Sequence, residues 1–146
     1  MHPYFDIPRP HLFGHRGASA EAPENTIPAF TRALERGVPH LELDCHATRD
    51  GEIVILHDAE LERTTDGEGL VSERSFAELE RLDAGYRFSP DGHSFPFRAC
   101  GVRVPRFSEV LAAFSGVHLN LEVKQAEPPI AEQVVRMVRG ANAASR

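Results

Sequence analysis

The chain has 146 residues, and its 16 lysines and arginines against 22 aspartates and glutamates give a formal net charge of −6 at pH 7. With 41% hydrophobic and 26% charged residues, it has the composition of one globular domain and not of a disordered chain. The acidic balance argues against nucleic-acid binding, because no lysine and arginine cluster offsets it. No apolar run approaches the ~20 residues of a membrane span, and no secretory signal is visible. We therefore expect a cytoplasmic protein without stable membrane insertion, in which Cys45 and Cys100 are reduced thiols.

The first half of the chain predicts alternating strands and helices. Residues 1–10 contain three prolines and read as an extended arm, and the apolar run 11–15 reads as a buried strand. Asn25 or Thr26 caps the following helix, which stops at Gly37. Two further strands are expected at 40–45 and 52–57. The nearly continuous apolar residues of 52–57 favour burial on both faces, as in a parallel sheet covered by helices.

The second half continues the alternation after a polar loop. A short helix is expected over 75–82, and a long irregular excursion over 83–105 contains four aromatic side chains that we expect to hold it together. A helix over 107–114, a strictly alternating strand at 118–124 and a last helix after Pro128 and Pro129 follow. This order predicts the α/β class. The expected organisation is an arm at 1–10, a domain at 11–140 that includes the excursion at 83–105, and a tail at 141–146.

Carboxylates occur where two of the predicted strands end. Glu42 and Asp44 are two residues apart in a strand and so share a face, and Glu122 lies near the end of another strand. If the strands are parallel neighbours, their carboxyl ends meet at one edge. Three carboxylates suit Mg²⁺ or Ca²⁺ and not the nitrogen and sulfur preference of zinc. The alternative is a solvated face, but apolar residues flank the pair, and burying it without a cation or a partner would be costly.

Histidines and cations follow the same strand ends. His15 and His57 each end an apolar run and could act as general acid and base near neutral pH. Arg16 and Lys124 could hold an anion, with arginine suited to a bidentate phosphate contact. Each of these residues alone has a plain explanation as a structural or surface side chain. Their combination with the carboxylates favours metal-assisted phosphoryl chemistry.

Six short motifs, in this order, resemble the glycerophosphodiester phosphodiesterase family. They are His15-Arg16-Gly17, Pro23-Glu24-Asn25-Thr26, Glu42-x-Asp44, Thr48-x-Asp50-Gly51, Val54-x-x-His57-Asp58 and Glu122-x-Lys124. Arg63-Thr64-Thr65 also resembles the loop that follows the family's second histidine, and the excursion resembles the family's insertion. The resemblance covers roughly residues 11–125.

The resemblance implies a (β/α)₈ TIM barrel that hydrolyses glycerophosphodiesters, which are small-molecule substrates, to sn-glycerol 3-phosphate and an alcohol. It implies a divalent cation, Mg²⁺ or Ca²⁺. Carried over by position, the metal ligands are Glu42, Asp44 and Glu122, the acid–base pair is His15 and His57, and the phosphate contacts are Arg16 and Lys124. The insertion would shape the glycerol or headgroup end of the pocket.

The chain is short for such a barrel, which typically needs ~250 residues. Only about four of its eight strands are expected here. Three explanations stay open, namely a fragment of a longer protein, a truncated product with little activity, and two copies that assemble into a homo-oligomeric barrel. Two other functions stay open as well, a lysophospholipase D-like phosphodiesterase and an inactive metal-binding or phosphate-binding module.

Overall fold

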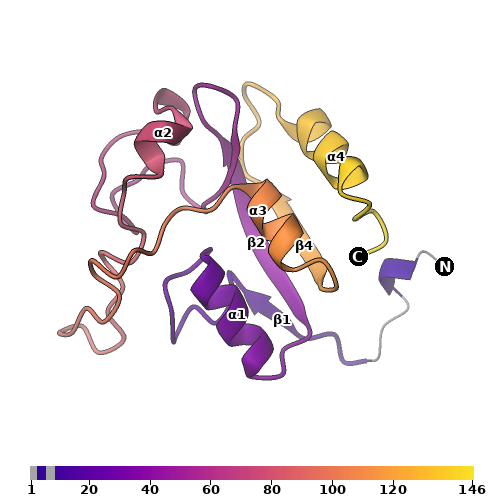
Figure 1. Cartoon of the computed structure of the whole chain (residues 1–146), viewed down its shortest axis with the longest axis horizontal. Helices are drawn as coiled ribbons and strands as arrows, with labels where there is room; N and C mark the ends of the chain where they lie inside the picture. Colours follow the sequence, from indigo (N-terminus) through magenta and orange to yellow (C-terminus); the bar gives the residue numbers. More distant parts are fainter. Residues whose placement is uncertain (1–2, 6–8) are drawn as a thin grey trace.

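A four-stranded mixed sheet forms the centre of the protein (Figure 1). The computed structural model describes residues 3–5 and 9–146. The strands are β1 (Phe13–His15), β2 (His40–Ala47), β3 (Ile53–Ile55) and β4 (His118–Val123). β2 is the central strand. It pairs in parallel with β1 along His40–Glu42 on one edge and with β4 along His40–Cys45 on the other.

The described residues form four α-helices, of which the first two begin at side-chain caps. They are α1 (Ile27–Glu35), α2 (Phe76–Leu79), α3 (Phe107–Ala113) and α4 (Ala131–Gly140), with 3₁₀ turns η1 (Pro3–Phe5) and η2 (Val71–Glu73). Thr26 is the cap of α1, because its Oγ1 accepts a hydrogen bond from the amide of Ala29 at 3.4 Å. Ser75 and Glu78 form a capping box at α2, which is shorter than the predicted 75–82.

β3 is buried on both faces, as predicted, but it runs antiparallel to β2 and not parallel to it. Its register joins Ala47 to Ile53 and Cys45 to Ile55. A tight turn at Asp50-Gly51 connects the two strands, and Gly51 takes a φ of +81° there. Because such a turn returns the chain alongside the strand it has just left, the pairing is antiparallel. The expectation of a parallel strand at 52–57 is therefore wrong, and three of the four strands are parallel.

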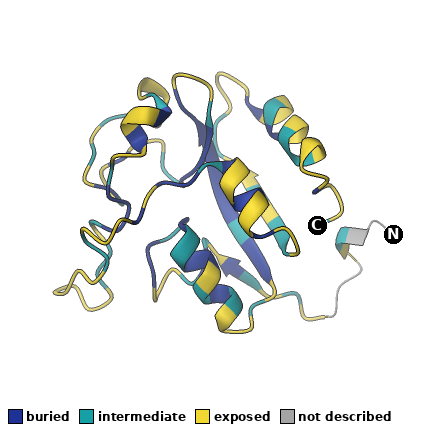
Figure 2. Ribbon diagram, in the orientation of Figure 1, coloured by how far each residue is buried: buried dark blue, intermediate teal, exposed yellow. Residues whose placement is uncertain are grey.

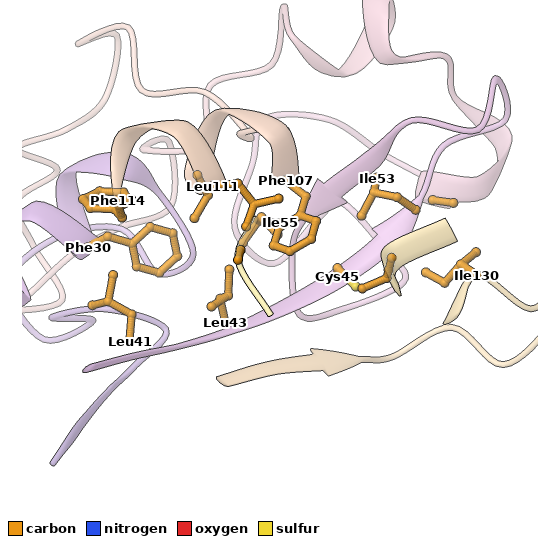
Figure 3. Packing of buried hydrophobic residues seen from close by; sticks show 14 of the residues in the cluster. Phe30, Leu41, Leu43, Cys45, Ile53, Ile55, Phe107, Leu111, Phe114 and Ile130 are labelled. Carbon is orange, nitrogen blue, oxygen red and sulfur yellow. The ribbon is translucent and has the colours of Figure 1, made fainter. Parts of the chain in front are cut away.

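The two faces of β2 have different roles. Its odd-numbered residues, Leu41, Leu43, Cys45 and Ala47, belong to the main core with residues of β3 and of helices α1, α3 and α4 (Figure 3). The thiol of Cys45 is buried in this core, and burial raises its pKa to about 12. Figure 2 shows β2 largely buried beneath helices that have exposed outer sides. The even-numbered residues of β2 project to the opposite face, so the side chains of Glu42 and Asp44 lie away from this core.

The excursion at 83–105 is held together by its own aromatic side chains. The rings of Phe88 and Phe97 meet edge to face with centroids 5.4 Å apart. The guanidinium of Arg98 lies 4.2 Å from the ring centroid of Tyr86 and 3.8 Å from that of Phe95. These contacts confirm that the aromatics fix the loop. A second apolar cluster, which contains Val54, Val71, Phe76, Leu79, Val102 and Val104, anchors the excursion to β3 and α2.

The predicted tail at 141–146 packs against α3. Ala143 is buried, and the guanidinium of Arg146 donates hydrogen bonds to the carbonyl oxygens of Phe114 at 2.8 Å and Leu111 at 3.0 Å. Part of the predicted arm, residues 6–8, lies outside the described residues, and the domain boundaries stay a prediction. Within the described ranges, no helix is both long and apolar enough to cross a membrane.

Candidate functional site

Three carboxylates meet where β2 and β4 lie side by side. Asp44 and Glu122 occupy paired positions on these two strands, and Glu42 lies two residues before Asp44 on the same face. One carboxylate oxygen from each of the three lies within 4.8 Å of the others. The Asp44 side chain is only 1% exposed, whereas that of Glu122 is 58% exposed. The parallel register therefore produces the carboxylate cluster that the sequence predicts.

Two cations lie against this cluster. The Lys124 ammonium lies 3.2 Å from Asp44 Oδ1 and 2.8 Å from Glu122 Oε1. Hydrogen bonding to Glu122, together with the negative charges of Asp44 and Glu122, raises the pKa of Lys124 despite some desolvation. On the other side, Arg16 Nε lies 3.4 Å from Asp44 Oδ2, and the backbone N–H of Arg16 donates to Glu42 Oε2 at 3.0 Å. Both predicted anion-binding residues are thus in direct contact with the carboxylates.

The donor set fits a divalent cation. Burial, and next the negative charge of Asp44, raise the pKa of Glu42. Three carboxylates lie beside the cations of Arg16 and Lys124, so negative charge is in excess when all three are ionised. Asp44 Oδ1 is buried and accepts no hydrogen bond of good geometry, although Lys124 lies within ion-pair distance of it. The three ligands offer only carboxylate oxygens, the donors that Mg²⁺ and Ca²⁺ prefer. Glu42, Asp44 and Glu122 could therefore hold such an ion.

Asn25 belongs to the site, although the sequence placed it in a family-like motif and gave it a role only as an alternative helix cap. Its Nδ2 donates to Asp44 Oδ2 at 2.9 Å, and the amide of Asp44 donates to Asn25 Oδ1 at 3.3 Å. Asn25 is buried and has a φ of +57°, a left-handed conformation that asparagine tolerates better than most residues. Its backbone N–H donates to the carbonyl oxygen of Arg16 at 3.0 Å. Asn25 thus fixes the orientation of the most buried carboxylate.

The two histidines are held by different parts of the fold. The His15 ring, at the end of β1, is 70% exposed, and its Nε2 lies 4.0 Å from Glu42 Oε2. His57 follows β3, and its Nδ1 lies 2.6 Å from Asp58 Oδ1. Its carbonyl oxygen lies 3.0 Å from Nε2 of His46, which ties the segment back to β2. His15 therefore contacts the carboxylate cluster directly, whereas His57 is linked to it through other charged residues.

Three further residues, Glu24, Asp58 and Arg63, make that link, and no sequence pattern gave any of them a role. Arg63 Nη1 and Nη2 each donate to the Glu24 carboxylate at 2.8 Å, and Arg63 Nε donates to Asp58. Glu24 also accepts a hydrogen bond from Arg16 Nη1 at 3.1 Å. Hydrogen bonding to Arg63 and to His57 lowers the pKa of Asp58 to about 2. The signals that could have found them are the motifs that contain them, with Glu24 before Asn25, Asp58 directly after His57 and Arg63 before Thr64-Thr65.

A cavity of about 370 Å³ lies beside this link. Glu24 and Arg63 form part of its wall, and Arg87 and Phe88 of the excursion form another part. The excursion thus lines a cavity next to charged residues that connect to the site. Its size is within the range of small-molecule pockets.

Comparisons with known proteins identify relatives of this chain. Residues 15–145 match the glycerophosphoryl diester phosphodiesterase family. A glycerophosphodiester phosphodiesterase from Caldanaerobacter subterraneus subsp. tengcongensis is 38% identical over 136 residues, which are 90% of this chain and 53% of that protein. A lysophospholipase D from Rattus norvegicus is 34% identical over 134 residues, which are 86% of this chain and 40% of that protein.

A solved structure shows the same likeness. It is a phosphodiesterase from Oleispira antarctica in complex with the product sn-glycerol-3-phosphate, with a TM-score of 0.80 and 34% identity over 94% of this chain and 54% of that one. The chain spans about half the length of these relatives, so its fold corresponds to part of their barrel. The family match over most of the chain, together with the carboxylate cluster at parallel strand ends, shows that the chain belongs to the glycerophosphoryl diester phosphodiesterase family.

Proposed function

We propose that the site serves metal-dependent hydrolysis of glycerophosphodiesters to sn-glycerol 3-phosphate and an alcohol. The observation that carries the proposal is the cluster of Glu42, Asp44 and Glu122, whose oxygens lie within 4.8 Å of one another beside two cations. The curated relatives that bear this activity in their names, and the relative with sn-glycerol-3-phosphate bound, support it. All-oxygen ligation favours Mg²⁺ or Ca²⁺ as the ion.

Some residues of the chain would bind the negatively charged phosphate, and others would transfer protons. Arg16 and Lys124 would contact the phosphate oxygens, because both cations already lie at the rim of the carboxylate cluster. One of His15 and His57 takes a proton from the attacking oxygen as the new P–O bond forms. The other gives a proton to the departing alcohol oxygen as the ester P–O bond breaks. A bound divalent cation would supply further neutralisation of the phosphate charge.

The proposal is tested by measuring metal binding and product release with the same chain. Calorimetry with CaCl₂ and MgCl₂ reports binding, and an enzymatic assay of sn-glycerol 3-phosphate reports hydrolysis of glycerophosphocholine. Glu122→Gln should abolish both, since it removes a metal ligand. Glu132→Gln is the matched control, because Glu132 is an exposed glutamate in an ion pair with Arg136 on α4. Hydrolysis that persists undiminished in Glu122→Gln would refute the assignment.

A lysophospholipase D-like activity is the second candidate, favoured by the similarity to the rat lysophospholipase D. The same assay with a lysophospholipid in place of glycerophosphocholine separates the two substrates. Higher kcat/KM for the lysophospholipid would establish this second function instead. Metal binding without release of product from either substrate would identify the chain as a metal-binding module and overturn both hydrolytic proposals.

A further inference from the structure

A chain of alternating charges runs from His57 to Arg16, outside the carboxylate cluster. His57 Nδ1 lies 2.6 Å from Asp58 Oδ1, and Asp58 Oδ2 accepts a hydrogen bond from Arg63 Nε. The two terminal nitrogens of Arg63 bind Glu24 at 2.8 Å each, and Glu24 Oε1 lies 3.1 Å from Arg16 Nη1. Two carboxylates and two guanidiniums balance, so the chain of contacts is neutral when the His57 ring is neutral.

Asp58 determines which nitrogen of His57 carries the proton. Hydrogen bonding to Arg63 and His57 holds the pKa of Asp58 at about 2, so the carboxylate is ionised at neutral pH and can only accept. Nδ1 must then be the donor across the 2.6 Å contact. In a neutral imidazole the other nitrogen, Nε2, then bears the lone pair that can take up a proton.

Arg63 in turn prevents Asp58 from turning away. Both oxygens of Asp58 are engaged, Oδ1 by His57 and Oδ2 by Arg63. The guanidinium uses its Nε for Asp58 and its other two nitrogens for Glu24, an arrangement that needs a planar group with several fixed donors. A lysine at this position would offer a point charge, but it could not satisfy both carboxylates in this geometry.

Glu24 links Arg63 to Arg16, which lies beside the carboxylate cluster. It lies directly before Asn25, which binds Asp44, and it is shared by Arg63 and Arg16. One guanidinium thus joins the loop that follows β3 to the loop that precedes α1. The first loop carries His57 and the second carries Asn25, the partner of Asp44, although His57 and Asn25 are distant in sequence.

We propose that Arg63 and Asp58 are positioning residues that hold His57 as its Nδ1–H tautomer, with Nε2 directed to proton transfer. The importance of this tautomer for catalysis rests on the proposed hydrolytic function. The positioning itself is a property of the folded chain and can be measured without substrate.

Imidazole NMR of the ¹⁵N-labelled chain at neutral pH tests the proposal. Loss of one signal in His57→Gln assigns the ring of His57. The wild-type chain should show a downfield, hydrogen-bonded Nδ1–H for that ring. Arg63→Met should lose this signal, with the ring nitrogens shifting toward those of an unconstrained imidazole. Asp58→Asn should lose it too, because the amide can donate to Nδ1 and favour the opposite tautomer.

Arg49→Met is the matched control, since Arg49 is an exposed arginine that pairs with Glu78 at 3.1 Å and donates to the carbonyl oxygen of Glu73. Its His57 signals should match the wild type. Amide spectra establish that each variant is folded. If Arg63→Met does not fold, Arg63→Lys replaces it in the test, because it keeps the positive charge and the aliphatic part of the side chain. Arg63→Lys should also lose the Nδ1–H signal, since an ammonium lacks the planar set of donors.

A folded Arg63 variant that retains the wild-type Nδ1–H signal would overturn the proposal. So would a wild-type ring that carries its proton on Nε2. Neither result bears on whether the chain hydrolyses a phosphodiester. Conversely, a chain that shows the expected tautomer but releases no sn-glycerol 3-phosphate would refute the proposed function and leave the positioning intact.

Discussion

Asn25 provides a sharp test of how the carboxylate cluster is built. Its side chain makes two hydrogen bonds with Asp44, at 2.9 Å to the carboxylate and at 3.3 Å from the amide. Asn25→Gly removes both and leaves the backbone unstrained, because glycine accepts the φ of +57°. Asn25→Ala removes the same bonds but adds a left-handed alanine. Comparing the two variants separates the side chain from the backbone.

The size of the effect follows from the burial of the partners. A hydrogen bond to a charged group contributes about 1.5–3 kcal/mol, and a neutral one about 1 kcal/mol. We therefore expect Asn25→Gly to lose about 3 kcal/mol of unfolding free energy. Asn25→Ala should lose about 1 kcal/mol more for its backbone. Because Asn25 orients Asp44, a proposed metal ligand, calcium affinity should fall about 10–100-fold in both variants.

Urea denaturation gives the stability, and calorimetry with CaCl₂ gives the affinity. Asn142→Gly is the matched control, because Asn142 has a similar φ of +52° but an exposed side chain. Its stability should change by less than about 0.5 kcal/mol. If Asn25→Gly loses no more stability than Asn142→Gly and binds calcium as tightly as the wild type, Asn25 does not orient Asp44 and the reasoning is refuted.

Three further variants test other parts of the structure. Gly17→Ala would place a Cβ 2.6 Å from the carbonyl carbon of Ala29 at a φ of +81°, so it should cost at least about 3 kcal/mol. Gly51→Ala, with the same φ but open space, should cost only about 1–2 kcal/mol, and equal losses in urea denaturation would contradict the packing argument. The Asp58 pKa of about 2 lies below the ordinary 3.8, so its contribution is complete above that ordinary value and is lost as pH falls toward 2. Asp58→Asn should therefore lower the free energy of unfolding by about 1 kcal/mol at pH 7, allowing for solvent screening, and by much less at pH 2.5. A loss of stability that does not depend on pH would count against the ion pair. Burial and the charge of Asp44 raise the pKa of Glu42, so its ionised form destabilises the metal-free chain above that pKa. Glu42→Gln should raise the Tm in metal-free buffer at pH 7, and this increase in Tm should disappear in acid. The variant should also lose the increase in Tm that CaCl₂ gives the wild type. If CaCl₂ still raises the Tm of the variant, Glu42 is not a metal ligand.

The sequence alone predicted those features that depend on neighbouring residues. The period of two along β2 placed Glu42 and Asp44 on one face and Cys45 on the other, and the structure confirms both faces. The capping signals at Asn25 or Thr26 and at Ser75 predicted where α1 and α2 begin, and the structure assigns the first cap to Thr26. Such features are decided within a few residues of backbone, where side-chain direction and capping follow from local geometry.

Only the tertiary structure decided how distant segments meet. The apolar run at β3 predicted burial, but its direction depended on the turn that pairs it with β2. Asn25 binds Asp44 across 19 positions, and Arg63 binds Glu24 across 39, so no local pattern specified either contact. Long polar side chains find their partners only when the folded backbone brings the loops together. The sequence thus determined which residues could carry the chemistry, and the tertiary structure decided which of them hold the others in place.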